Sequence, residues 1–236
     1  MLVRSEGERK VQIAVPTGDL NDTVTKRLRR VGLKFSPVEK KNLVSVDNLA
    51  VDMLLIRPSS VPEMVMHGRT RTRAGLTGGD IVWNWDPAKK DQGTTIPTIA
   101  NESTLFVGVT KPLADRIRGE DGREPRAEDL IGSTVVTKFP RIAEDVFGGM
   151  VDIWAMPGST EAMQYALDDA EGILDVTATG GAIRANQLTV VEKLMSPVDV
   201  RMIQQPGLSS FEERIIADFT GLLLHTDENH RYPVSV

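Results

Sequence analysis

Short apolar runs alternate with segments of helical periodicity along most of the chain. Val24, Leu28 and Val31 recur at helical spacing and predict a helix, with Asn21 or Asp22 as its N-cap. The apolar runs predict strands at 11–15, 51–56, 73–80, 105–109, 134–137, 151–154, 172–176 and 198–203. Further helices are predicted at 60–66, 141–147, from 158 onward, at 188–195 and at 211–224. Strands that alternate with helices in this way are typical of an α/β fold.

The elements form two successive series, and the chain returns to the first series at its end. This order predicts two lobes, residues 1–104 plus 196–236 in the first and residues 105–195 in the second. Loops at the carboxyl ends of the strands would then face a cleft between the lobes, where α/β proteins bind ligands. The last helix is expected to pack on the chain's own core through Phe211, Ile215, Phe219 and Leu222.

One junction carries the clearest chemical signal. The strand that begins at Gly172 leads into the loop Thr177-Ala178-Thr179-Gly180-Gly181-Ala182, which opens a helix. Glycine lets the backbone turn tightly, while threonine hydroxyls and free helix amides can converge on one point. The loop is therefore a candidate phosphate site, although an ordinary strand-to-helix turn has the same pattern.

Composition narrows the function classes. The chain has 236 residues and a net charge of −5, so it lacks a global basic field that would attract nucleic acid. It contains no cysteine, which excludes disulfides and thiolate chemistry, and its three histidines are scattered. Because no secretory signal and no membrane-spanning run is evident, we expect a cytoplasmic protein.

Six segments, taken together, resemble the catalytic part of ATP phosphoribosyltransferase, the enzyme that opens histidine biosynthesis. They are Ile13–Leu20, Ile56–Val65, Ala74–Asp80, Val136–Pro140, Gly158–Glu161 and Asp175–Asn186. The resemblance spans roughly residues 11 to 203. It implies a two-lobed fold of the type II periplasmic-binding-protein class, with a cleft between the lobes.

The resemblance also implies a reaction. The family transfers the 5-phosphoribosyl group of phosphoribosyl pyrophosphate to N1 of ATP and releases pyrophosphate with the help of Mg²⁺. By resemblance, the loop at 177–182 would hold the 5-phosphate, and Glu161 and Asp175 would lie near the ribose or its metal. Other substrate-binding residues would be Gly18, Arg57, Asp80 and Lys138.

The implied partners follow from the same resemblance. The extent of the chain is similar to the family's short form, which depends on a regulatory subunit resembling histidyl-tRNA synthetase. Members of that family form oligomers, so the resemblance favours a homo-oligomer. Magnesium would be bound mainly by substrate phosphates, with one or two protein carboxylates.

Several loop residues depart from the family pattern. Thr17 and Asp19 stand where the family usually has cations, and Ala182 lacks the hydroxyl usual at the end of the phosphate loop. Arg73 replaces an acid, and Asn84 replaces a glutamate. Because the changes concentrate in loops that would touch substrate, the acceptor stays open between ATP and another nitrogen heterocycle.

Two other features remain open between a binding role and a structural one. Arg69, Arg71 and Arg73 would share one face of a strand, either as an anion-binding strip or as a solvated edge. Trp83 and Trp85 could stack a heterocycle, or they could belong to the core or an interface. Arg184 or the arginine strip could compensate for Asp19.

The leading hypothesis is a divergent phosphoribosyltransferase that acts on phosphoribosyl pyrophosphate or a related sugar phosphate. The alternative is a non-catalytic binding or regulatory protein that kept the fold. A solute-binding protein of the same fold is a third hypothesis, which the missing signal sequence disfavours.

Overall fold

The computed structural model describes residues 10–37, 42–68, 70–99, 102–156 and 170–224. Their contacts group them into two units. Unit 1 takes the described residues of Met1–Ile81, Asp91–Ala100 and Val200–Val236, and unit 2 takes those of Val82–Lys90 and Asn101–Asp199. Residues 82–90, which the sequence pattern assigned to the first lobe, group here with unit 2. The lobe boundaries at 104 and 196 stay predictions.

The described part of unit 1 contains a seven-stranded sheet in the order β2-β3-β4-β1-β5-β12-β6. Its strands are β1 (Val11–Pro16), β2 (Phe35–Pro37), β3 (Leu43–Val46), β4 (Val51–Ile56), β5 (Thr72–Gly78), β6 (Thr94–Thr95) and β12 (Val200–Gln204). Its helices are α1 (Asp19–Arg30), the 3₁₀ helix η2 (Pro58–Ser60), α2 (Val61–Met66) and α7 (Ser210–Leu224). Strand β1 runs parallel to β4 and β5, whereas β12 is antiparallel to β5.

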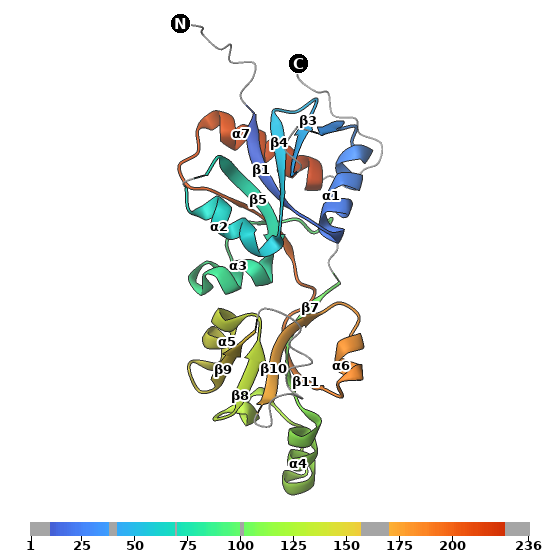
Figure 1. Ribbon diagram of the computed structural model, residues 1–236, viewed down its shortest axis with the longest axis vertical. Helices are drawn as coiled ribbons and strands as arrows, with labels where there is room; N and C mark the ends of the chain where they lie inside the picture. Colours follow the sequence, from blue (N-terminus) through green and yellow to red (C-terminus); the bar gives the residue numbers. More distant parts are fainter. Residues whose placement is uncertain (1–9, 38–41, 69, 100–101, 157–169, 225–236) are drawn as a thin grey trace, which may run out of the picture. The chain divides into compact units, whose positions relative to one another are not determined.

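Helices cover both faces of the strands at the centre of this sheet (Figure 1). Alternate residues of β1, Val11, Ile13 and Val15, lie in one buried cluster with residues of α1 and α7. Helix α2 packs on the opposite face, where Gly75 of β5 leaves room for it. A Cβ atom on Gly75 would lie 2.6 Å from Val61 Cγ1, so a larger residue would push α2 away.

Unit 2 is built on a five-stranded sheet in the order β11-β7-β10-β8-β9, counting the described residues. Its strands are β7 (Thr104–Val109), β8 (Thr134–Thr137), β9 (Asp152–Ala155), β10 (Ala170–Thr177) and β11 (Thr189–Met195). Its helices are the 3₁₀ helix η3 (Pro87–Lys89), α4 (Lys111–Asp121), the 3₁₀ helix η4 (Ala127–Leu130), α5 (Pro140–Phe147) and α6 (Gly181–Ala185). Helix α3 (Gly79–Trp85) begins in unit 1 and ends in unit 2. No helix in the described ranges is long and apolar enough to cross a bilayer.

The α/β fold and most of the predicted strands are confirmed, one helix prediction is wrong, and the predicted start of another helix is too late. Residues 189–195 form strand β11, which pairs with β7, because α6 stops at Ala185 and Gln187 turns the chain with a φ of +53°. Helix α1 begins at Asp19 after Gly18, earlier than the predicted caps Asn21 and Asp22. The helix predicted from residue 158 lies outside the described residues.

The prediction for the last helix is confirmed. Ile215, Phe219 and Leu222 of α7 are buried in the unit 1 core, and Phe211 packs against it. The C-terminal segment therefore completes unit 1, since β12 also lies inside the same sheet.

Candidate functional site

The loop after β10 is held in shape by its own threonines. Thr177 Oγ1 accepts the Gly180 N–H at 3.0 Å, and Thr179 Oγ1 accepts the Gly181 N–H at 3.3 Å. Gly180 has a φ of +67°, in the left-handed region that favours glycine. Because each hydroxyl acts as an acceptor inside the loop, its own proton remains for an outside acceptor such as a phosphate oxygen.

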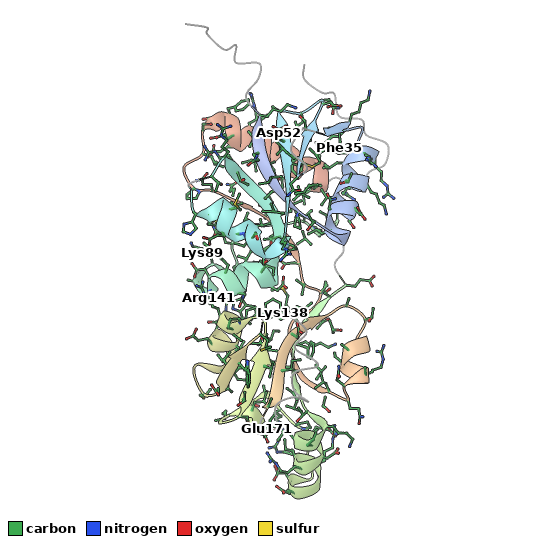
Figure 2. The ribbon with its side chains drawn as sticks, in the orientation of Figure 1. Phe35, Asp52, Lys89, Lys138, Arg141 and Glu171 are labelled. Carbon is green, nitrogen blue, oxygen red and sulfur yellow. The ribbon has the colours of Figure 1, made fainter. Side chains whose placement is uncertain are left out.

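An ion pair between an exposed lysine and a buried carboxylate lies at the base of this loop. Strands β8 and β10 are parallel neighbours, so their carboxyl ends bring Lys138 and Asp175 together. Lys138 Nζ lies 2.7 Å from Asp175 Oδ1, and Figure 2 labels Lys138 where β8 ends. The Asp175 side chain is 1% exposed and its Oδ1 also accepts the Val176 N–H. The lysine therefore supplies a counter-charge to a carboxylate that water hardly reaches.

Helix α6 carries a third charged group to the loop. Arg184 Nη1 donates a hydrogen bond to the Thr179 carbonyl at 3.2 Å, although the side chain is exposed. Asn186 closes the other end of α6 by donating to the Ala182 carbonyl at 2.9 Å. Ala182 itself is half-buried and adds no hydroxyl, whereas Ala178 is exposed at the loop's outer side.

Three other predicted site residues lie in unit 1. Gly18 follows β1, Arg57 follows β4 and Asp80 follows β5, and these strands are parallel neighbours in the order β4-β1-β5. Their carboxyl ends therefore share one edge of the sheet. Gly18 has a φ of +86°, Arg57 is exposed, and Asp80 is 8% exposed in the first turn of α3.

The predicted site residues thus form two groups, one in each unit. Unit 1 holds Gly18, Arg57 and Asp80, and unit 2 holds Lys138, Asp175 and the loop 177–182. Glu161 lies outside the described residues.

Arg73 does not belong to an anion-binding strip. Its Nε donates to Glu212 Oε1 at 2.8 Å and its Nη1 to Gln205 Oε1 at 2.6 Å. Glu212 also accepts the N–H and hydroxyl of Ser209, and these bonds, the backbone one first, lower the pKa of Glu212. We call these four residues the Arg73 network. It ties β5 to α7, while Arg71 is exposed and Arg69 lies outside the described residues.

The tryptophan segment is structural within unit 2. Trp83 is 9% exposed and its Nε1 donates to Asp145 of α5 at 2.8 Å. Asn84 Oδ1 accepts the N–H of Arg141 at 3.1 Å, so it caps the first turn of α5 (Figure 2 labels Arg141). The interior interpretation of Trp83 is therefore the correct one, and Asn84 gains a role that the sequence did not reveal.

A metal would have few protein ligands here. Among the described residues, no group of three or more histidine, aspartate or glutamate side chains is arranged to hold an ion. Asp175 Oδ1 is already bonded to Lys138 and Val176. The donor set fits an ion carried mainly by a substrate's phosphate oxygens, with at most one or two protein carboxylates.

Comparisons with known proteins identify relatives of most of the chain. A family model described as HisG, ATP phosphoribosyltransferase, matches residues 57–223. The ATP phosphoribosyltransferase of Natronomonas pharaonis is 30% identical over 204 residues, which are 84% of this chain and 67% of that protein. The enzyme of that name from Caldanaerobacter subterraneus is 25% identical over 211 residues, 87% of this chain and 92% of that protein.

A solved structure has the same fold. The ATP phosphoribosyl transferase (HisG:HisZ) complex from Thermotoga maritima matches with a TM-score of 0.67 and 22% identity. The match covers 90% of this chain and 95% of that chain. At this identity the likeness shows the fold, which agrees with the two-lobed α/β class predicted from the sequence.

Proposed function

The chain belongs to the ATP phosphoribosyltransferase family of glycosyltransferases, and from this premise we propose that it transfers the 5-phosphoribosyl group of phosphoribosyl pyrophosphate to a ring nitrogen of ATP. Phosphoribosyl transfer is the activity that the family and the relatives indicate. The observation that supports the proposal best is the loop 177–182, where two threonine hydroxyls and Arg184 are donors of the kind that suit a phosphate ligand.

The proposed step is a displacement at the anomeric carbon. The acceptor nitrogen forms a bond to C1′ of the ribose, while the bond from C1′ to the pyrophosphate oxygen breaks and its electron pair leaves with pyrophosphate. Such a step needs positioned reactants and charge stabilisation at the leaving group rather than a side-chain nucleophile. We assign the 5-phosphate to the loop 177–182 and the ribose to the neighbourhood of Asp175, which pairs with Lys138.

Unit 1 would contribute residues for the remaining parts of the substrates. Arg57 is an exposed cation at the sheet edge and suits a pyrophosphate oxygen, and we assign Gly18 and Asp80 to the same role of substrate binding. In the sequence, Thr17 and Asp19 stand where the family pattern has cations. This difference is the reason to test acceptors other than ATP.

Magnesium is the proposed cofactor. Bound to pyrophosphate oxygens, it would neutralise the charge that develops on the leaving group. Asp175 and Glu161 are the candidate protein ligands, and Glu161 lies outside the described residues. The protein's own part is to hold the 5-phosphate and to keep Asp175 oriented through Lys138.

We also propose a cytoplasmic location, a homo-oligomer, and a regulatory partner of the kind named in the Thermotoga maritima HisG:HisZ complex. Copurification with a candidate partner, followed by light scattering, measures the assembly. Activity with and without the partner then tests whether the partner is needed.

The decisive experiment follows pyrophosphate release from phosphoribosyl pyrophosphate, Mg²⁺ and ATP, with mass spectrometry of the adduct. An ATP adduct supports the proposal. Binding of phosphoribosyl pyrophosphate without an ATP adduct points to another acceptor. A protein that neither binds the sugar phosphate nor releases pyrophosphate, alone or with its partner, is a non-catalytic member of the family.

A further inference from the structure

The phosphate loop needs a positive charge that the motif itself does not contain. A sugar 5-phosphate carries close to two negative charges at neutral pH. Threonine hydroxyls and backbone amides are dipoles, so they leave that charge uncompensated. A nearby cation would make the hydrogen bonds to the phosphate stronger and shorter.

Lys138 is not available for this purpose. Its ammonium lies 2.7 Å from Asp175, whose side chain is 1% exposed. If the lysine turned to a phosphate, it would leave a buried carboxylate without its counter-charge, which is costly. The Lys138–Asp175 pair is therefore neutral as a unit and adds no net charge to the loop.

Arg184 has the opposite surroundings. Its guanidinium forms one hydrogen bond, to the Thr179 carbonyl, and no ion pair with any carboxylate in the described ranges. A guanidinium has five N–H donors, so most of them remain for a ligand. The Thr179 bond ties the guanidinium to the backbone of the loop.

The loop backbone is shaped to let the guanidinium approach. A Cβ atom on Gly180 would lie 3.1 Å from Arg184 Nη1, tighter than an ordinary contact. Gly180 therefore serves two purposes, the turn at a φ of +67° and the space for the arginine.

We propose that Arg184 is the specificity-determining cation of the phosphate loop, which makes the loop select a sugar with a 5-phosphate dianion over the same sugar without it. This inference rests on the proposed function, because it assigns a ligand group to the same loop. Arg184 would bind the phosphate and take no part in bond breaking at C1′.

The test compares wild type with Arg184→Gln and Arg184→Lys. Lys193→Gln is the charge-matched control, since Lys193 is exposed on β11 of the same unit and forms no ion pair among the described residues. Steady-state kinetics give KM and kcat for phosphoribosyl pyrophosphate with ATP and Mg²⁺. Calorimetry gives the affinities for ribose 5-phosphate and for ribose.

We expect Arg184→Gln to raise KM and to weaken ribose 5-phosphate binding by about 10- to 100-fold, the usual effect of losing a charge-assisted hydrogen bond. The turnover number kcat should change little, because the phosphate contact is equal in the ground state and the transition state. Arg184→Lys should recover part of the loss. Lys193→Gln should behave as wild type.

Salt provides a readout that a purely structural role would not move. Between roughly 50 and 500 mM NaCl, ribose 5-phosphate binding by wild type should weaken more steeply than binding by Arg184→Gln, because salt screens an exposed charge contact. Over this range the Debye length falls below about 10 Å. Melting temperatures within about 2 °C of wild type would show that the variants fold.

The outcomes separate this inference from the proposed function. If wild type turns over and Arg184→Gln has an unchanged KM, the role of Arg184 is wrong while the proposed function stands. No turnover by wild type, with ribose 5-phosphate binding that depends on Arg184, supports the role of Arg184 while the proposed function fails. If wild type does not prefer ribose 5-phosphate to ribose, the inference is wrong.

Discussion

Arg73 in unit 1 and Arg184 in unit 2 lie in polar clusters of different kinds. Arg73 donates to Glu212 and Gln205, so its charge is matched inside the fold. Arg184 forms a hydrogen bond to the Thr179 carbonyl and no ion pair among the described residues, so its charge is not matched by a carboxylate. The difference fits a stabilising role for the first cluster and the proposed ligand-binding role for the second.

Lys138→Met should give the largest effect, because it removes the positive charge that pairs with Asp175 beside the loop. We expect a loss of about 3 kcal/mol in the free energy of unfolding, since Asp175 would be buried without a counter-charge. Urea denaturation measures it. The double variant Lys138→Met with Asp175→Asn should recover most of the loss, and an unchanged single variant would contradict the importance of the pair.

Gly180→Ala tests whether the space for Arg184 matters for binding. Gly148→Ala is the matched control, because Gly148 also has a positive φ, +55°, but its added Cβ would meet nothing within 4 Å. Both variants should lose about 1 kcal/mol of stability from backbone strain. Only Gly180→Ala should also raise KM for phosphoribosyl pyrophosphate, by roughly 10-fold, through displacement of the guanidinium. Equal KM values in the two variants would argue against this account.

Arg73→Gln should affect folding without affecting the substrate. The Glu212 side chain, 12% exposed, would lose its charged partner, and we expect a cost of about 1–2 kcal/mol in the free energy of unfolding. Chemical denaturation and steady-state kinetics on the same preparation measure both quantities. A raised KM for phosphoribosyl pyrophosphate would return Arg73 to the substrate-binding residues.

The smallest effect is the pH dependence of the Arg73 network. The Ser209 backbone bond, and then the Ser209 hydroxyl and Arg73, lower the pKa of Glu212 in the folded state. Its stabilising contribution is therefore complete above the unfolded pKa of about 4.3, and it is lost as pH falls through the folded pKa. Wild type should lose stability more steeply below about pH 4 than Glu212→Gln, as denaturation at several pH values would show. Parallel pH profiles would contradict the prediction.

The sequence predicted the central strands well because they are mostly apolar, as in Val51–Ile56, where Asp52 is the one polar residue. It failed at β11, where Thr189–Met195 includes charged residues and pairs with β7 only in the folded chain. The hairpin of β2 and β3 was not predicted, because three- and four-residue strands have little periodicity.

The candidate site was predictable only where its signal is local. The loop 177–182 is readable because glycine and threonine have specific turn properties within a few residues. The partner of Arg73 was not readable, since Glu212 lies 139 residues further along the chain. The role of Asn84 as a cap on α5 was not readable either, because only the fold brings the two segments together. The ion pair of Lys138 with Asp175 needed the parallel register of β8 and β10.

The place of the C-terminal segment in unit 1 also constrains how the protein can be made on the ribosome. Strand β12 lies between β5 and β6, and α7 fills the core under β1, so unit 1 lacks an interior strand and a helix until residues 200–224 have emerged. The described segments of unit 2 are complete by residue 199. Synthesis should therefore release a folded unit 2 before unit 1, the reverse of the usual order from the N-terminus. Nascent chains stalled before β12 should expose the apolar strands of unit 1 to chaperones.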